Sequence, residues 1–267
     1  MKRRSFVKGS LISGAAAAIA PVAAVSQSKP LKDKIPYIEH YELRVYTFKD
    51  ERQQKITEDF YREVFVPMMQ QKRYETVGVF TELDPAGQTK LYVLIPFNTY
   101  VHAEGLYYFL EDNKDYWARG AAYLNAPADN PAFEHLETSM LKAFKHMPSK
   151  QIPAREKRIF ELRQYKSASE AAGKKKIEMF NDKGEIDIFK RLGFKPVFFG
   201  ETIIGNDRPN LTYMVTFKDM EDKGAHWKAF GGDPEWKKIS AVPEYADALL
   251  VSKITSTMLV PTDYSGI

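Results

Sequence analysis

Hydrophobic and polar positions alternate in two segments that predict strands, and both strands carry the same motif. Residues 41–48 and 158–166 each contain Glu-Leu-Arg-x-Tyr, at 42–46 and at 161–165. Alternation with a period of two places the Glu, Arg and Tyr side chains on one face and the intervening residues on the other. The copies start 119 residues apart, a length typical of one small domain.

The pattern around the second copy predicts a complete set of elements. Apolar residues at helical spacing and clusters of turn residues separate helices from strands, and Asp219 and Asp233 are suited to cap helices. In order, the predicted elements are a strand over 158–166, a helical region over 169–191, strands over 195–204 and 211–217, a helix over 219–230, a helical turn from Asp233 and a strand over 249–257.

The first copy predicts the same order of elements. They are a strand over 41–48, an amphipathic helix with Ile56, Phe60, Val64 and Met68 on one face, strands near 76–83 and 90–97, a helix from Asn98 and a strand over 135–144. The aromatic segment from Tyr107 to Trp117 aligns with the segment from His226 to Trp236. This internal similarity predicts two copies of one small domain.

Two β-α-β-β-α-β units predict an α+β fold made of tandem ferredoxin-like repeats, at 38–145 and 158–262. The polar segment 146–157 contains two prolines and is the predicted linker. We expect the apolar face of each first strand to meet the helices and the Glu-Arg-Tyr face to lie on the open side of its sheet. Two such sheets can close into one intrachain α/β barrel with pseudo-twofold symmetry, which would direct the polar faces into a shared interior.

The positive charge of the chain is concentrated at its start. The formal net charge of +4 rests on four basic residues among the first ten, so the remaining body is neutral and no nucleic-acid partner is expected. Arg3-Arg4-x-Phe6-x-Lys8 precedes an Ala-rich apolar stretch, which predicts a twin-arginine signal peptide over 1–26 and a mature N-terminal linker over 27–37. An ordinary secretory signal or an uncleaved anchor is the alternative. The expected localisation is periplasmic or otherwise exported, and no membrane-embedded domain is expected.

Several classes of chemistry have no support in the sequence. There is no cysteine, which excludes disulfides, thiol catalysis and cysteine-ligated metals. The five histidines form no metal-binding motif, and glycine-rich nucleotide loops are absent. Neither a metal nor a cofactor is therefore expected.

Short motifs in the second copy resemble the NIPSNAP family. They are the Glu-Leu-Arg-x-Tyr opening, Gly184-Glu185-Ile186, Leu192-Gly193-Phe194-Lys195-Pro196-Val197-Phe198-Phe199-Gly200 and Asp233-Pro234-Glu235-Trp236. The resemblance is strong over 158–262 and weaker over 38–145, where only Trp117 remains of the last element. It implies a ferredoxin-like fold of the dimeric α/β-barrel group, and it implies no reaction.

Two groups of side chains are candidate ligand contacts. The Arg and Tyr side chains of the motif offer donors to a carboxylate or enolate-like oxygen, and the alternative is a salt-bridged network that orients the two halves. The aromatic residues can roof an apolar pocket or belong to the core, and the histidine can be a general base or a structural residue. The candidates are Glu42, Arg44, Tyr46, Glu161, Arg163, Tyr165, His226, Trp227 and Trp236. No catalytic residue is assigned.

These observations favour an exported protein that binds a small aromatic or carboxylated ligand in a barrel cleft. A cofactor-free monooxygenase or isomerase that uses the same cleft is one alternative, and a non-catalytic partner-binding module is another. Ligand binding requires an unfilled polar and aromatic cavity between the sheets. A partner-binding module predicts a filled interior and an exposed apolar patch. Homo-oligomerisation is compatible with each of them.

Overall fold

The computed structural model describes residues 37–71 and 76–267, which form an α+β fold built around one closed antiparallel barrel. The strands follow one another around the barrel in the order β1-β3-β2-β8-β5-β7-β6-β4. They are β1 (His40–Thr47), β2 (Gly78–Glu82), β3 (Lys90–Phe97), β4 (His135–Ala143), β5 (Ile159–Ser167), β6 (Lys195–Ile204), β7 (Asn210–Phe217) and β8 (Val251–Pro261). The predicted signal peptide lies outside the described residues.

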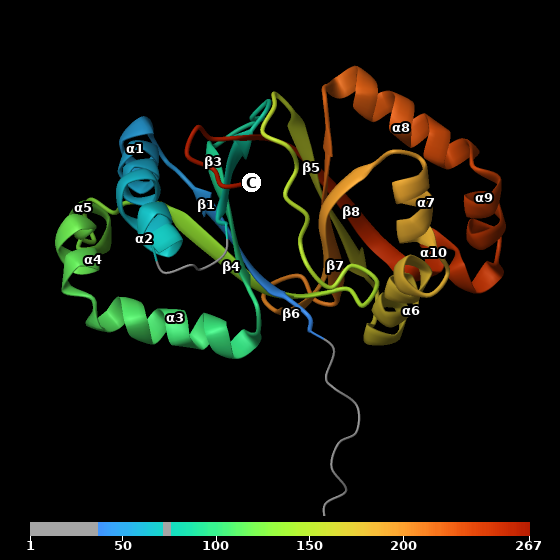
Figure 1. The fold of residues 1–267 in the computed structure, drawn as a ribbon, viewed down its shortest axis with the longest axis horizontal. Coiled ribbons are helices and arrows are strands. Elements are labelled where there is room, and N and C mark those ends of the chain that lie inside the picture. Colours follow the sequence, from blue (N-terminus) through green and yellow to red (C-terminus); the bar gives the residue numbers. More distant parts are fainter. Residues whose placement is uncertain (1–36, 72–75) are drawn as a thin grey trace, which may run out of the picture. The chain divides into compact units, whose positions relative to one another are not determined.

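Helices cover the outside of the barrel. Figure 1 shows those of the N-terminal half on one side of the strands and those of the C-terminal half on the other. They are α1 (Glu51–Phe60), the π-helical turn η1 (Tyr61–Phe65), α2 (Val66–Gln71), α3 (Tyr100–Asp112), α4 (Lys114–Arg119), α5 (Ala121–Leu124), α6 (Glu170–Asn181), α7 (Glu185–Arg191), α8 (Met220–Gly232), α9 (Pro234–Ser240), the 3₁₀ turn η2 (Pro243–Tyr245) and α10 (Asp247–Leu250).

Each half contributes four adjacent strands to the barrel. The N-terminal half has the order β4-β1-β3-β2 and the C-terminal half has the order β8-β5-β7-β6, so the first strand of each half is central as predicted. Two seams join the halves, one between β2 and β8 and the other between β4 and β6. Closure through both seams pairs every strand on both sides.

Capping residues set the starts of corresponding helices in the two halves. As predicted, Asp219 caps α8 by accepting a hydrogen bond from Asp222 N, and Asp233 caps α9 in front of Pro234. In the N-terminal half Thr99 caps α3 and Asn113 caps α4. The paired caps are 120 residues apart.

This offset corrects the predicted alignment by one position. Tyr107 corresponds to Trp227, and Tyr116 corresponds to Trp236. Burial agrees, because Tyr116 is 8% exposed whereas Trp117 is 42% exposed. The prediction that Trp117 is the counterpart of Trp236 was therefore wrong.

The barrel interior holds a buried apolar cluster, which overturns the predicted orientation of the repeated motif. All eight strands contribute to one buried cluster, and the helices contribute no buried residue to it. Leu43 and Leu162, the second residues of the two motifs, belong to this cluster. Phe80 and Phe160 meet across the halves with ring centroids 5.0 Å apart. The Glu-Arg-Tyr faces consequently point outward, into the layer between the barrel and the helices.

The reversal has a physical reason. The interior is bounded on all sides by strands, and its contacts are the apolar side chains of both halves. A carboxylate and a guanidinium placed there would lose their hydration, which costs several kcal/mol per ion unless every hydrogen bond is replaced. The helix layer supplies such partners, because its tyrosine and tryptophan side chains reach the motif residues.

Candidate functional site

A pocket of about 350 Å³ lies between β1 and the helices of the N-terminal half. Its polar wall contains three predicted candidates, Glu42, Arg44 and Tyr46. Its remaining lining is largely aromatic and aliphatic and comprises Phe60, Tyr107, Leu110, Glu111, Tyr116, Trp117, Tyr123, Leu124, Leu136 and Thr138. We call this cavity the Arg44 pocket. Its volume falls within the range of small-molecule sites.

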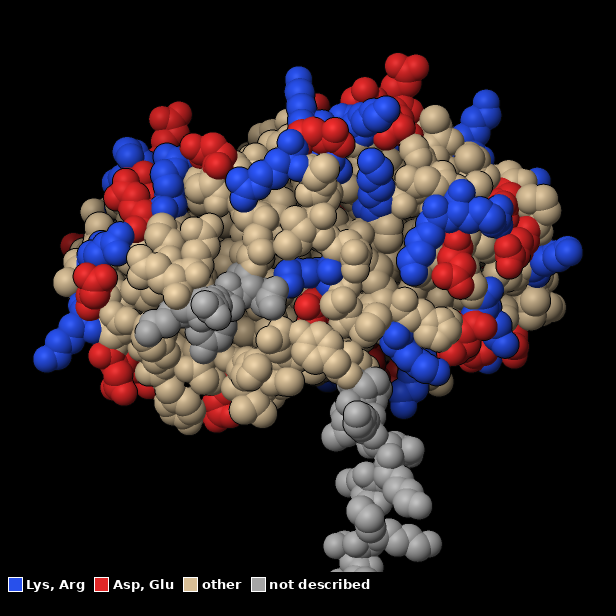
Figure 2. Space-filling view, in the orientation of Figure 1, with Lys and Arg blue, Asp and Glu red and all other residues tan. Residues whose placement is uncertain are grey.

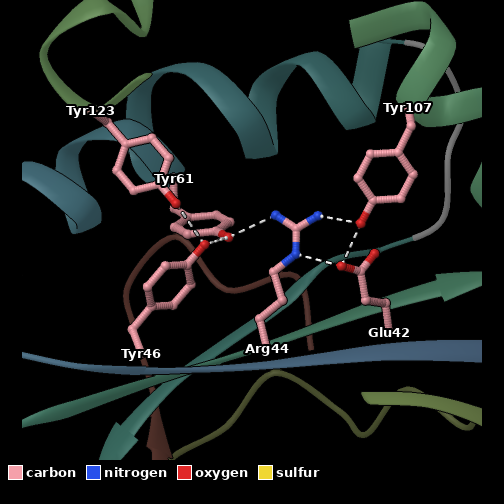
Figure 3. Close-up of polar contacts among 6 residues, drawn as sticks. All are labelled: Glu42, Arg44, Tyr46, Tyr61, Tyr107 and Tyr123. Carbon is pink, nitrogen blue, oxygen red and sulfur yellow. Dashed lines mark hydrogen bonds and ion pairs between the residues drawn. The ribbon is translucent and has the colours of Figure 1, made fainter. Parts of the chain in front are cut away.

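The Arg44 guanidinium is the centre of the polar wall (Figure 3). Its Nε donates to Glu42 Oε1 at 2.7 Å, its Nη1 to Tyr61 Oη at 3.1 Å and its Nη2 to Tyr107 Oη at 3.1 Å. The guanidinium also lies 5.4 Å from the ring centroid of Phe65. These contacts hold Arg44 in one orientation while its side chain stays 12% exposed.

A chain of phenols extends from Arg44. Tyr46 Oη lies 2.8 Å from Tyr61 Oη and 2.8 Å from Tyr123 Oη. Tyr61 begins the π-helical turn η1, whose extra residue per turn alters which side chains face the sheet. Such turns occur frequently at functional sites.

All of these phenols are protonated at neutral pH. Burial raises the pKa of Tyr107 to about 12, although the neighbouring Arg44 guanidinium lowers it. Burial likewise raises the pKa of Tyr46, Tyr61 and Tyr123. The Arg44 pocket therefore presents neutral hydroxyl groups and one cation.

The Glu42 carboxylate is only half satisfied. Tyr107 Oη donates to its Oε1 at 2.6 Å, the same oxygen that Arg44 uses. Oε2 is buried and has no hydrogen-bond partner among the described residues. A buried acceptor without a partner costs about 1–3 kcal/mol, so a donor on a bound ligand would relieve this cost.

The same motif in the C-terminal half is covered by protein side chains. Glu161 accepts from Trp227 Nε1 at 2.7 Å, from Ser256 Oγ at 2.6 Å and from Arg163 Nη1 at 3.0 Å. The indole of Trp227 covers the Arg163 guanidinium at 4.5 Å. Both carboxylate oxygens of Glu161 thus have partners, in contrast to those of Glu42.

A further buried network adjoins this second motif. Arg163 Nη2 donates to Tyr165 Oη at 2.9 Å, and Lys176 Nζ lies 5.4 Å from the Tyr165 ring centroid. Lys176 donates to Asp247 Oδ1 at 3.0 Å. Burial raises the pKa of the Glu185 carboxyl to about 7, against the opposing effect of Lys176.

Two other predicted candidates, Trp236 and His226, do not line the Arg44 pocket. Trp236 packs on Phe230 with ring centroids 4.5 Å apart, as a core aromatic would. His226 Nδ1 lies 2.8 Å from the carbonyl oxygen of Asp222, and the His226 ring packs against Phe194 and Phe217. His226 therefore lines a different pocket, together with Lys195 and Lys218.

Sequence reasoning missed three tyrosines of the hydrogen-bond network around Arg44 and Tyr46. Tyr61 directly follows Phe60, a residue of the predicted apolar stripe, and its position on the adjacent helical face was the available signal. Tyr107 lies in the aromatic segment that was aligned with α8, but the shift of one position hid its equivalence to Trp227. Tyr123 lies in α5, a short helix that periodicity did not predict.

Two other kinds of feature concern residues 37–71 and 76–267, the part of the chain that the structure describes. No helix in this part of the chain is long and apolar enough to cross a membrane. Within the same residues, no group of three or more His, Asp or Glu side chains is placed to hold a metal ion.

Comparison with known proteins identifies the C-terminal half. Residues 160–266 match the NIPSNAP family. The chain carries a NIPSNAP domain. In the structure this domain runs from β5 to the C-terminal end of the chain and contains the Glu161–Arg163 network. A search of curated proteins gives no match.

Three solved structures resemble the whole barrel. A candidate monooxygenase from Fusobacterium nucleatum is 12% identical, with a TM-score of 0.57, covering 87% of this chain and 98% of its own. One from Lactobacillus acidophilus is 12% identical, with a TM-score of 0.54 and coverages of 84% and 94%. An anthrone oxidase-like protein is 10% identical, with a TM-score of 0.51 and coverages of 84% and 91%. At these identities the likeness shows the fold alone.

Proposed function

We propose that the protein binds a small aromatic ligand carrying a hydroxyl or carbonyl oxygen in the Arg44 pocket. The observation that carries this proposal is the combination of a donor-rich wall with one unpartnered acceptor, Glu42 Oε2. A ligand hydroxyl can donate to Glu42 Oε2 while its oxygen accepts from one of the Arg44 N–H groups that has no partner within the network. The predicted ligand was aromatic or carboxylated, and the buried Glu42 carboxylate favours the uncharged aromatic form.

The location of this site differs from the predicted cleft. The barrel interior holds a buried apolar cluster with side chains from all eight strands, and the polar side chains of the motif point away from it. The Arg44 pocket is on the outer face of the same central strand, under the helices. The aromatic rings of Phe60 and Tyr116 and the side chain of Leu110 supply apolar surface for a flat ligand.

Calorimetric titration with 1-naphthol and 1-naphthoate tests the proposal. We expect 1-naphthol to bind and 1-naphthoate to bind more weakly, since its carboxylate meets the carboxylate of Glu42. Tyr107→Phe removes a hydroxyl that contacts both Glu42 and Arg44. It should weaken 1-naphthol binding by about fivefold, because Glu42 and Arg44 lose the hydrogen-bond partner that holds both of them in place for the ligand.

The neighbouring tyrosine provides a matched control. Tyr108 is 62% exposed, and its hydroxyl contacts Glu104 at 3.4 Å rather than the pocket. Tyr108→Phe should leave the dissociation constant unchanged. Equal effects of the two variants, or tighter binding of 1-naphthoate, would contradict the proposal.

A catalytic role is the second candidate, and Glu42 is the residue that favours it. Glu42 lines the pocket, its Oε2 has no hydrogen-bond partner among the described residues, and a carboxylate oxygen of this kind can accept a proton from a bound substrate. A cofactor-free oxygenation of an activated aromatic substrate would fit the candidate monooxygenases and the anthrone oxidase-like protein that share the fold, although fold likeness carries little functional weight. Oxygen uptake with 1-naphthol that is lost in Glu42→Gln would support catalysis, and its absence in the wild-type protein would favour binding alone.

Partner binding is favoured by a different surface. Helix α3 exposes Tyr100, Val101 and Tyr108 at 47%, 68% and 62%, and Trp117 of α4 is also exposed. Exposed apolar side chains gathered on neighbouring helices are typical of interaction sites. By contrast, Figure 2 shows basic and acidic side chains interspersed over the face in view. A mass measurement of the purified protein distinguishes a monomer from a homo-oligomer.

We further propose that the two halves are tandem ferredoxin-like repeats, at 38–145 and 158–262, joined by the linker 146–157. The equivalent strand orders and the equivalent positions of Arg44 and Arg163 support this duplication.

Export through a twin-arginine signal over residues 1–26, into the periplasm or beyond, is proposed from the sequence. Replacing Arg3 and Arg4 by lysine should retain a C-terminally tagged protein in the cytoplasm. Unchanged export of that variant would contradict a twin-arginine route.

A further inference from the structure

A second polar pocket lies beside the linker and shares no lining residue with the Arg44 pocket. It has a volume of about 250 Å³, and we call it the Arg158 pocket. Its charged and polar lining comes from the linker, β6, β7, α8 and the segments that flank them. These residues are Glu156, Arg158, Lys195, Thr216, Lys218, Asp222 and His226.

Arg158 is buried in this wall with unmet hydrogen-bonding capacity. Its side chain is 5% exposed, and its Nη2 donates to Glu156 Oε1 at 2.5 Å. Its Nε is buried and has no hydrogen-bond partner among the described residues. A buried guanidinium N–H without an acceptor is costly, and an oxyanion is the group that Arg binds best.

Basic side chains outnumber acidic side chains in the lining of the Arg158 pocket. Asp222 contacts two other residues of the lining. Its Oδ2 accepts from Lys218 N at 3.0 Å, and its Oδ1 lies 3.2 Å from His226 Nδ1. Among the described residues, neither the Lys195 nor the Lys218 ammonium lies within an ion-pair distance of an acid. The lining therefore has three cations, Arg158, Lys195 and Lys218, against the two carboxylates Glu156 and Asp222.

The His226 imidazole is held on both sides, by Asp222 and by Gly193. Its Nδ1 lies 2.8 Å from the Asp222 carbonyl oxygen, which can only accept, so Nδ1 carries the proton. Its Nε2 faces Gly193, which also lines the pocket. A Cβ at Gly193 would lie 3.2 Å from Nε2, and the φ of +87° at this residue also favours glycine. A side chain at residue 193 would therefore crowd the His226 ring.

A larger pocket adjoins the Arg158 pocket at Lys195, which lines both. It has a volume of about 540 Å³ and contains the basic residues His146, Lys190 and Lys195, while no Asp or Glu is among its lining residues. Met147, Pro148, Ile152, Pro153 and Pro196 provide its apolar surface. This lining suits an amphipathic molecule, whose anionic end can contact the basic residues while its apolar part contacts the apolar surface.

We propose that the Arg158 pocket binds the oxyanion head of a small organic anion, whose apolar part lies in the larger pocket beyond Lys195. The head group accepts from Arg158 Nε and from the Lys195 ammonium. Phosphate monoesters and carboxylates share this chemistry. The proposal is independent of the function proposed for the Arg44 pocket.

Calorimetric titration at low salt with phenyl phosphate and with benzoate tests this site and separates the two head groups. We expect one of the two probes to bind at a single site. Lys195→Gln should weaken that binding about tenfold, as expected for one charge-assisted hydrogen bond. Inorganic phosphate should bind more weakly than phenyl phosphate because it lacks the apolar part.

Lys114→Gln is the control for overall charge, since Lys114 is an exposed residue that lines neither pocket. It should leave the affinity unchanged, as should Tyr107→Phe in the Arg44 pocket. Arg158→Lys keeps the charge but loses the Nε donor, and with an unchanged unfolding midpoint it should also weaken binding. Absence of binding by both probes, or equal weakening by Lys195→Gln and Lys114→Gln, would overturn the proposal.

Discussion

A single guanidinium organises the polar layer of the N-terminal half. Arg44 joins a carboxylate of its own strand to hydroxyls from η1 and α3, three segments that are distant in sequence. Its side chain extends from β1 towards the helices, and these three partners hold its charged end. The cost of burying the ion pair is offset only while both members are present.

Removing one member of this pair should cost more than removing both. Arg44→Met leaves the Glu42 carboxylate buried without its cation, and we expect the free energy of unfolding to fall by roughly 3 kcal/mol. The double variant Glu42→Gln/Arg44→Met should be less destabilised than Arg44→Met alone. Urea unfolding of the wild-type protein and of both variants measures this. A double variant that is as destabilised as Arg44→Met, or more so, would contradict the coupling.

Glu185 should make stability depend on pH. Burial raises the pKa of its carboxyl to about 7 in the folded chain, so the folded state binds this proton more tightly than the unfolded state does. Its stabilising contribution is present below the ordinary pKa of about 4.5 and is lost as the pH rises towards 7. By linkage this loss is on the order of 3 kcal/mol.

Glu185→Gln removes the titrating group and tests this expectation. Urea unfolding at pH 5 and pH 8 should show a smaller decrease for Glu185→Gln than for the wild-type protein. Lys176 faces the same site with a raised pKa, but its titration lies above this interval. Parallel pH dependences of the two proteins would contradict the assignment.

At the scale of elements, α3 and α8 occupy equivalent positions in the two halves, but only α8 covers the arginine of its motif. Tyr107 of α3 reaches Glu42 with a hydroxyl, whereas Trp227 of α8 reaches Glu161 with an indole that also covers Arg163. The larger ring occupies the space over the guanidinium. One substitution between equivalent positions thus distinguishes a covered network from an accessible pocket.

The sequence predicted the elements well and the orientation of their faces poorly. Strand alternation and helix caps identified the two sets of strands and the central place of β1 and β5. Alternation shows which residues share a face, but it does not show which face is inside. That choice depends on distant partners such as Tyr61 and Tyr123, which one strand's pattern cannot reveal.

Helix α3, which carries Tyr107, should control access to the Arg44 pocket. Helix α3 buries only Ala103, Leu106 and Leu110 against the rest of the protein. Leu106→Ala removes a fully buried anchor and should raise hydrogen exchange in α3 more than in β1. Exchange measured by mass spectrometry on both segments tests this, and an equal rise in β1 would indicate global rather than local loosening.

At the scale of the whole molecule, the barrel interior makes the two halves one cooperative unit. Side chains from both halves pack in the same cluster, including Leu43 of β1 and Leu162 of β5. Neither half can cover its interior-facing residues without the other. Unfolding of residues 37–267 is therefore expected to occur in a single transition.

Leu43→Ala tests this cooperativity from one side of the barrel. The cavity it leaves should lower the free energy of unfolding by about 2–5 kcal/mol. Because the interior is shared, hydrogen exchange should rise in β5 and β7 as well as in β1. A rise confined to the N-terminal half would show that the halves unfold independently.

The most direct test of the account is a crystal structure of the protein grown with 1-naphthol. We expect the naphthol ring between β1 and the helices, with its hydroxyl within hydrogen-bonding distance of Glu42 Oε2 and of Arg44. Naphthol bound elsewhere, or an Arg44 pocket that holds none at concentrations where titration shows binding, would contradict the proposed site.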